Sequence, residues 1–307
     1  MAGILLHIAG LWLLSSLDAS GKLLVMAGVP VLMVSWFRYV VHIGLMTAVV
    51  LPQRGRAIFA TKSLPRQLQR GLMMITTTVL FFSVLGRVPL AEGTAMNFMA
   101  PLFLMALAPW LLQEPHRLHR WLGVVVGFAG MLIVMRPGGQ LDRVGVILGL
   151  LTALAFALFQ IATRRVAHDD PLTTNYYGGL FGAIALTLAL PWFWRTPQLA
   201  PWQWLLLAST GVTGFLGHWL QIAAFKRAPA TLLAPFSYLQ IVAAATLGWL
   251  VFGQLPDRAT AAGIALICAA GLGVAVAEAR LAARRAHDLR ANLDKVAAPT
   301  GPGPAAP

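Results

Sequence analysis

The sequence has 307 residues, of which 58% are hydrophobic and only 11% are charged. Soluble domains carry about 25% charged residues, so this composition excludes an ordinary soluble protein and predicts an integral membrane protein. The net charge of +13 is spread over short segments between apolar runs, which argues against a nucleic-acid partner. The single cysteine, Cys268, offers neither a disulfide framework nor a metal site, and no motif calls for a cofactor.

Apolar runs of about 20 residues recur along the chain, which is the length that a helix needs to cross the hydrocarbon core. Because backbone groups in lipid must bond one another, we expect these runs to be helices. The sequence therefore predicts an all-α integral membrane protein with ten transmembrane helices. In chain order, the expected spans are 3–24, 30–51, 71–87, 91–112, 120–136, 145–166, 173–194, 203–225, 230–252 and 259–277.

Lysine and arginine are distributed unequally between the two sets of connecting segments. With the N-terminus in the cytoplasm, 16 of the 23 Lys and Arg residues fall in cytoplasmic segments and 5 fall outside, while Lys22 and Arg38 lie within spans. The positive-inside rule therefore predicts a multi-pass protein of the cytoplasmic (inner) membrane with both termini in the cytoplasm.

The two halves of the chain resemble each other at a shift of 140 residues. The Arg-Val-Pro sequence at 87–89 aligns with Arg-Ala-Pro at 227–229, and Gly123 aligns with Gly263. A unit of five spans is odd, so the second unit would enter the membrane upside down, as in many secondary transporters. The expected domains are a first five-helix repeat at 1–140, an inverted second repeat at 141–278, and a basic cytoplasmic tail, partly disordered, at 279–307.

Four stretches resemble the EamA-type members of the drug/metabolite transporter superfamily. The first span with its polar break looks like the opening helix of the family, and Trp-Phe-Arg-Tyr at 36–39 looks like its second-helix arginine signature. Residues 99–114 resemble the fourth helix, with its proline and terminal glutamate, and residues 237–254 resemble the ninth. The resemblance covers about residues 3–277 and implies a transporter rather than an enzyme. Within the family, the chain looks most like the YddG-like amino-acid exporters.

The ninth span departs from the family pattern at two positions. Gln240 and Gln254 stand where the family often has glutamate, so ion coupling through acid groups at these positions is in doubt. Protonation of His218, whose side chain titrates near neutral pH, is an alternative route to proton coupling, and uncoupled facilitation is another.

Three charged residues lie inside the first two spans, where each costs free energy in lipid and needs a reason. Asp18 and Lys22 are four residues apart and share one helical face, and Arg38 in the second span is close enough to join them. They form either a gate or coupling-ion site, or a structural network of ion pairs at the outer ends of the helices.

Polar and aromatic residues deeper in the spans are the candidate substrate contacts. Thr78 and Phe81 align with His218 and Gln221 at the 140-residue shift, which predicts a pseudo-symmetric central site. The alternative is that these side chains only join helices to one another, and that Trp219 faces lipid. The full set of candidate substrate contacts is Trp12, Ser16, Thr78, Phe81, Asn97, Gln160, His218, Trp219, Gln221 and Tyr238.

The hypothesis from sequence is a secondary transporter that exports small neutral or zwitterionic metabolites, with amino acids, aromatic or apolar ones included, as first candidates. It would work by alternating access around a central cavity, as a monomer or homodimer in the lipid bilayer. Efflux of cationic drugs is the alternative within the class, and a membrane-embedded enzyme is the alternative outside it. The cavity is expected to contain little buried charge.

Overall fold

The computed structural model describes residues 1–111, 118–135, 141–194, 198–228 and 230–297, and within these ranges every regular element is a helix. The all-α expectation is therefore confirmed for the described residues. Seven of their helices are long and apolar enough to cross a membrane, and two shorter apolar helices accompany them at 121–134 and 239–252. The chain is a multi-pass membrane protein.

The described residues of the first half form nine helical elements. In chain order they are α1 (Ala2–Met26), α2 (Val31–Leu45), η1 (Met46–Val50), α3 (Leu51–Arg54), η2 (Gly55–Phe59), α4 (Leu64–Leu85), α5 (Leu90–Asn97), α6 (Ala100–Leu111) and α7 (Leu118–Met135).

In the second half, the part that the structure describes forms six helices. They are α8 (Arg143–Arg165), α9 (Pro171–Phe193), α10 (Pro201–Phe225), α11 (Ala230–Ser237), α12 (Leu239–Phe252) and α13 (Arg258–Ala297).

The third span begins earlier than the sequence predicted. Helix α4 starts at Leu64 rather than at residue 71, with Pro65 in its first turn, where a missing backbone N–H removes no helical bond. Arg70, which hydropathy assigns to a cytoplasmic segment, is therefore a buried helical residue. The error arises because the first turns of α4 carry several polar side chains, which lower the local hydropathy.

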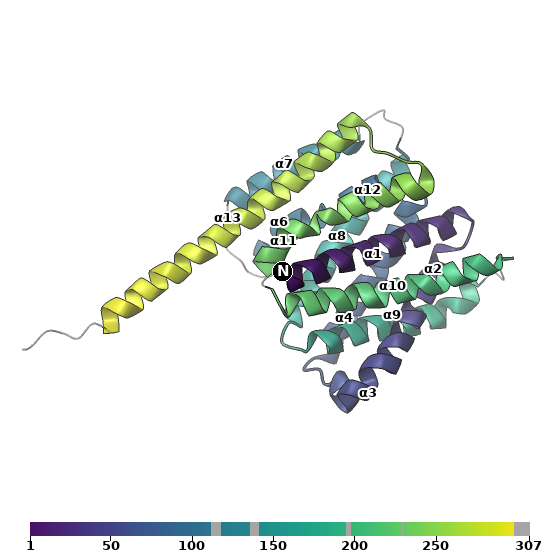
Figure 1. Cartoon of the computed structure of the whole chain (residues 1–307), viewed down its shortest axis with the longest axis horizontal. Coiled ribbons are helices and arrows are strands. Elements are labelled where there is room, and N and C mark those ends of the chain that lie inside the picture. Colours follow the sequence, from purple (N-terminus) through teal and green to yellow (C-terminus); the bar gives the residue numbers. More distant parts are fainter. Residues whose placement is uncertain (112–117, 136–140, 195–197, 229, 298–307) are drawn as a thin grey trace, which may run out of the picture.

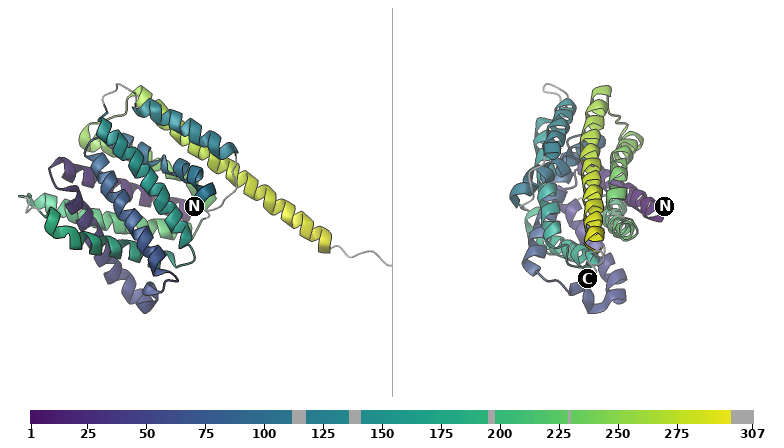
Figure 2. Two further views of the ribbon diagram at one scale, coloured as in Figure 1. Left: turned by 180° about the vertical axis from the view of Figure 1, so that it is seen from behind. Right: turned by 90° about the vertical axis from the view of Figure 1, so that its left-hand side faces the viewer.

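The helices form two layers that meet along both edges (Figure 1). One layer contains α13, α12, α1 and α10, in which α1 packs against both α10 and α12. The other contains α7, α6, α8 and α4, in which α8 packs against α4 and α6 (Figure 2). Contacts between α7 and α13 close one edge, and contacts between α2 and α9 close the other. Beyond the bundle, α13 continues as a projecting helix.

The helix contacts interchange under the 140-residue shift. The shift carries α1 onto α8 and α10 onto α4, so the α1–α10 contact corresponds to the α4–α8 contact. The edge contacts α2–α9 and α7–α13 each correspond to themselves. Helices that are equivalent under the 140-residue shift therefore make equivalent contacts in the two halves.

Glycine allows α7 and α13 to approach closely. A Cβ added to Gly130 would lie 2.9 Å from the Gly263 carbonyl oxygen, and one added to Gly263 would lie 2.7 Å from the Gly130 carbonyl oxygen. Real Cβ atoms do not approach carbonyl oxygens this closely, so larger residues would separate the helices. Small residues at such a crossing are typical of membrane helices.

Two pairs of short consecutive helices, α5 with α6 and α11 with α12, are each separated by a turn, and the two turns lie at equivalent positions. The turn between α5 and α6 lies at Phe98 and Met99, and the turn between α11 and α12 lies at Tyr238, 140 residues after Phe98. Pro101 follows the first break and cannot donate to the carbonyl four residues before it, which explains the interruption there. Pro109 lies inside α6 and does not end it.

Candidate functional site

A group of polar side chains lies between the two layers, near the edge that α2 and α9 close. We call it the central polar cluster, and it draws on four helices that are far apart in sequence. Its members are Asp18 from α1, Arg38, Tyr39 and His42 from α2, Arg70 and Thr78 from α4, and His218 from α10.

Helix α2 supplies the main hydrogen bonds of the cluster. Arg38 and His42 are four residues apart and therefore share one face of this helix. Arg38 donates from Nη1 to Thr78 Oγ1 at 3.0 Å, and Tyr39 Oη shares a hydrogen bond of 2.8 Å with the same oxygen. The Arg38 guanidinium also lies 5.9 Å from the centroid of the Phe82 ring. These contacts orient Arg38 while leaving most of its N–H groups unused.

Two histidines of the cluster lie next to each other. The rings of His42 and His218 have centroids 6.0 Å apart and an interplanar angle of 79°. Nε2 of each ring is buried and has no hydrogen-bond partner in the structure. His42 is only 4% exposed, so solvent does not satisfy it either. Unpaired polar atoms of this kind are rare in folded proteins and call for an explanation.

Arg70 belongs to the central polar cluster, although it was not among the site residues predicted from the sequence. It donates from Nε to Thr163 Oγ1 at 3.0 Å and from Nη1 to the Thr174 carbonyl at 2.9 Å, and its guanidinium lies 4.7 Å from the Phe159 ring. The expectation of little buried charge is therefore wrong. The available signal was the spacing of Arg70 and Thr78, which places both on one face of a helix that begins before residue 70.

Asp18 and Lys22 do not pair, although they share a helical face. Asp18 is buried and interacts electrostatically with Arg38, without an ion pair inside 4.0 Å. Lys22 donates instead to the carbonyl oxygens of Leu85 and Val88, the first at 2.8 Å. Helix α1 thus directs Asp18 toward the central polar cluster and Lys22 toward the end of α4.

Lys22 has a different acidic neighbour, which the sequence reading overlooked. Glu92, in the first turn of α5, is 6% exposed, and its Oε2 has no hydrogen-bond partner. Lys22 is 2% exposed and acts on Glu92 electrostatically. The Phe252 ring lies 5.3 Å from Lys22 Nζ. Lys22 therefore stabilises the junction of α1, α4, α5 and α12, apart from the central polar cluster.

Gln221 and Ser16 make local contacts. The His7 ring bonds Gln221 Oε1 through Nδ1 and Ser237 Oγ through Nε2, and Gln221 Nε2 donates to the His7 carbonyl at 3.1 Å. Because an amide oxygen only accepts, Nδ1 of His7 carries the proton. Ser16 donates to the Trp12 carbonyl within its own helix. The side chains of Gln221 and Ser16 are thus already engaged.

The remaining candidate contacts are scattered. Trp12 is 39% exposed, and Trp219 packs on the Phe215 ring with centroids 5.7 Å apart. Phe81 lies beside a cluster of buried apolar residues. Asn97 has a buried Oδ1 without a partner at the break after α5. Gln160 on α8 and Tyr238 at the second helix break are half-buried.

Outside the cluster, a second network ties two connecting segments together. The Asp169 carboxylate, between α8 and α9, accepts hydrogen bonds from Thr61 Oγ1, from the Lys62 backbone N–H at 3.1 Å and from Gln67 Nε2 at 2.9 Å. Burial raises the pKa of Asp169, but these hydrogen bonds outweigh it, so the pKa lies below its usual value. His168 at 3.4 Å adds a weak attraction.

The described ranges contain no group of three side chains able to hold a metal ion. A groove of about 360 Å³ lies between α12 and the start of α13, lined mostly by apolar side chains such as Ile241 and Trp249. None of the candidate site residues lines it, so it is separate from the central polar cluster.

The EamA-like transporter family model matches residues 1–136 and again residues 143–276. The chain belongs to this family. As an EamA-like transporter it carries small molecules across a membrane and is not an enzyme, in agreement with the resemblance seen in the sequence. The two matched segments correspond to the two halves related by the 140-residue shift.

Characterised relatives of this EamA-like chain handle different molecules. It is 28% identical over 217 residues to an S-adenosylmethionine uptake transporter of Rickettsia bellii, covering 70% of this chain and 74% of the relative. It is 29% identical over 275 residues to the pseudopaline exporter CntI of Pseudomonas aeruginosa, covering 88% and 94%. It is 30% identical over 182 residues to a riboflavin transporter of Vibrio cholerae, covering 59% and 60%.

A solved protein structure supports the fold. It superposes with a TM-score of 0.64 over 91% of this chain and 98% of its own, at 22% sequence identity. At that identity the likeness extends to the fold only.

Proposed function

We propose that this EamA-like transporter exports amino acids or similarly sized neutral or zwitterionic metabolites by alternating access. The observation that carries the proposal is the central polar cluster, which lies between two layers built from equivalent helices. It contains both a carboxylate, Asp18, and a guanidinium, Arg38, that are not joined in an ion pair. A zwitterion presents the two complementary charges.

The ten-helix, inverted-repeat architecture is part of this proposal. Counting α2 through η2, α5 with α6, and α11 with α12 as single interrupted spans gives ten, five on each side of residue 140. An odd number of spans per half inverts the second half, and rocking of one half against the other would expose the cluster to each side in turn. The interchange of helix contacts under the 140-residue shift supports this view.

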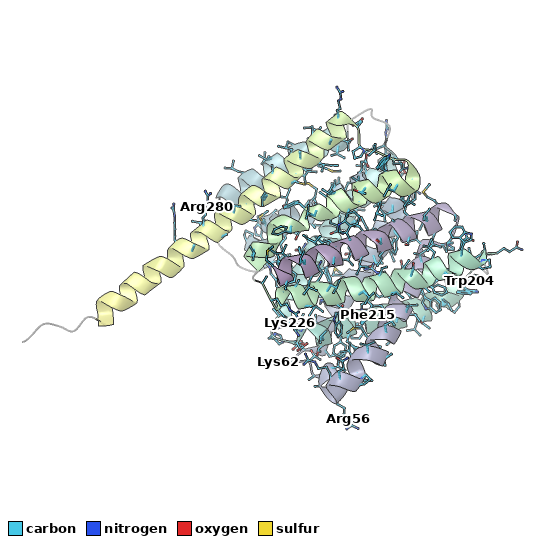
Figure 3. The ribbon with its side chains drawn as sticks, viewed as in Figure 1. Arg56, Lys62, Trp204, Phe215, Lys226 and Arg280 are labelled. Atoms are coloured by element: carbon cyan, nitrogen blue, oxygen red, sulfur yellow. The ribbon has the colours of Figure 1, made fainter. Side chains whose placement is uncertain are left out.

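Orientation in the cytoplasmic membrane follows from the charges. Lys62, Lys226 and Arg280 lie at the end of the bundle where the chain begins, whereas Trp204 lies at the opposite end (Figure 3). Basic residues on one side and tryptophan at an interface favour a cytoplasmic N-terminus. The direction of export is supported by the pseudopaline exporter, which matches a larger share of this chain than the uptake transporter does.

Counterflow in proteoliposomes tests the proposal. Vesicles containing the purified chain and loaded with one unlabelled compound are offered its labelled form, for a panel of amino acids, sugars and cationic drugs. We expect exchange of amino acids, lost in His218→Ala and kept in Arg87→Gln, a change in an exposed loop. Exchange of cationic drugs alone, or of nothing in the panel, overturns the proposed substrate class.

A further inference from the structure

Charge is not balanced in the central polar cluster. Arg38 and Arg70 contribute two positive charges, and Asp18, which interacts electrostatically with Arg38, contributes the one carboxylate of the cluster. His218 lies within electrostatic range of both arginines and of His42, with no acidic group among its neighbours. An interior with one excess positive charge is costly in a low-dielectric environment, so a bound anion would be stabilised there.

The two arginines differ in how many donors they have left. Arg70 is held by Thr163, by Thr174 and by an aromatic ring, so its role in the cluster is structural. Arg38 makes one hydrogen bond, to Thr78, and no ion pair inside 4.0 Å. A guanidinium has five N–H groups arranged in a planar fork that matches a carboxylate. Arg38 is therefore the group that can donate hydrogen bonds to an incoming carboxylate.

Arg38 lies beside α10 at a glycine, where the backbones come close. A Cβ added to Gly214 would lie 2.9 Å from Leu17 Cδ1 and 3.9 Å from Arg38 Nε. His42 is on the same face of α2 as Arg38, and His218 is one turn from Gly214 on α10. Both histidines bring a buried Nε2 without a partner, and an imidazole Nε2–H donates well to a carboxylate oxygen.

We infer that Arg38, His42 and His218 form a carboxylate-recognition site, so that a carboxylate is the required feature of the transported molecule. This inference rests on the proposed function and changes the substrate requirement from a neutral or zwitterionic molecule to a molecule with a carboxylate, whether or not it also carries an amine. Asp18 then serves the amine of a zwitterion and is dispensable for acids without one. Cationic compounds are rejected by the excess positive charge.

Matched compounds test the requirement directly on the full chain in nanodiscs. The probes are L-leucine, L-leucinamide, 3-methylbutylamine and 4-methylpentanoate, with the corresponding series from L-tryptophan, and the readout is stabilisation against thermal unfolding. We expect stabilisation by the two compounds of each series that carry a carboxylate and not by the amide or the amine. Stabilisation by amides or amines, or by no acid of the panel, overturns the inference.

Substitutions assign the requirement to the named residues. Arg38→Gln should weaken binding of the acids about 10-fold to 100-fold, because a hydrogen bond to a charged group contributes about 1.5–3 kcal/mol. His218→Gln, which keeps a donor, should weaken it less than His218→Leu. Arg87→Gln is the matched control. If Arg38→Gln fails to fold, the two His218 variants decide, and equal affinity in both overturns the role of the imidazole.

The outcomes for this site and for transport are separable. A chain that binds acids selectively but exchanges none of them retains the recognition site and overturns the export proposal. A chain that exchanges amides or sugars as well as acids retains transport and overturns the carboxylate requirement.

Discussion

The aromatic rings of Phe98 and Tyr238 contact each other with centroids 5.2 Å apart and planes inclined by 35°. The two residues are 140 positions apart, and each lies where one helix ends and another begins. In the proposed inverted-repeat architecture, a pair that maps onto itself under the repeat would lie at the axis relating the halves. The contact thus joins the first half to the second at the point where both interrupted spans change direction.

We expect this contact to couple the stability of the two halves. Phe98→Ala and Tyr238→Ala should each lower the melting temperature in detergent, and the double variant should lose less than the sum, with a coupling of about 0.5–1.5 kcal/mol. Combining Phe98→Ala with Phe37→Ala, whose ring packs on Trp204 instead, gives the additive control. Additivity in both pairs would show that the ring contact does not form.

Replacement of Lys22 should be strongly destabilising. Lys22→Met leaves two carbonyl oxygens without their donor and Glu92 without a positive neighbour, and a buried polar group left unsatisfied costs about 1–3 kcal/mol, more when it is charged. Adding Glu92→Gln should recover part of the loss, since it removes the uncompensated charge. The exposed ion pair Arg87–Asp142, at 3.0 Å, gives the comparison, because Arg87→Gln should cost about 1 kcal/mol or less. Thermal unfolding measures all three variants.

The Asp169 network makes stability depend on pH in the acid range. Its folded-state pKa lies below the unfolded value, about 3.9, so its stabilisation is complete above that pH and is lost as the pH falls through the folded-state pKa. Asp169→Asn should cost about 1–3 kcal/mol at pH 7. The difference in melting temperature from wild type should shrink below about pH 4. A difference that stays constant down to pH 3 contradicts this account.

Gln221 and His218 should respond differently to substitution, although sequence reading placed both in the substrate site. Gln221→Ala leaves the Nδ1–H of His7 without an acceptor, so we expect a loss of about 1–3 kcal/mol in stability with little change in affinity for acids. His218→Ala should do the reverse, because its Nε2 has no protein partner to lose. Melting temperatures and probe affinities of the two variants distinguish a structural role from a role in binding. If both variants lower the affinity equally, Gln221 belongs to the substrate site after all.

The proposed orientation is open to chemical labelling. Arg56 lies in η2 and is exposed, so Arg56→Cys in a Cys268→Ser background places one reactive thiol in the connection before α4. We expect a membrane-impermeant maleimide to label it in inside-out vesicles and not in intact cells. Labelling from outside the cell would reverse the orientation.

The sequence by itself determined that the chain is a helical membrane protein with two related halves. Span length depends on the thickness of the hydrocarbon core, and backbone groups in lipid must bond within a helix, so hydropathy is sufficient to predict membrane-spanning helices. The relation between the halves follows instead from residues that match at a shift of 140 positions. The start of α4 was misplaced because its first turns are polar, and that one error moved Arg70 out of the membrane region.

Which polar groups meet was decided only by the tertiary structure. Helical spacing correctly places Asp18 and Lys22 on one face. Their side chains nevertheless interact with different helices, Asp18 with α2 and Lys22 with α4. Likewise, His42 is a candidate site residue only because its ring lies beside that of His218, 176 residues away, and because it shares a helical face with Arg38. Hydrogen bonds and charges act over a few ångströms, so their partners depend on how helices pack, and a single sequence records only the periodicity of each helix.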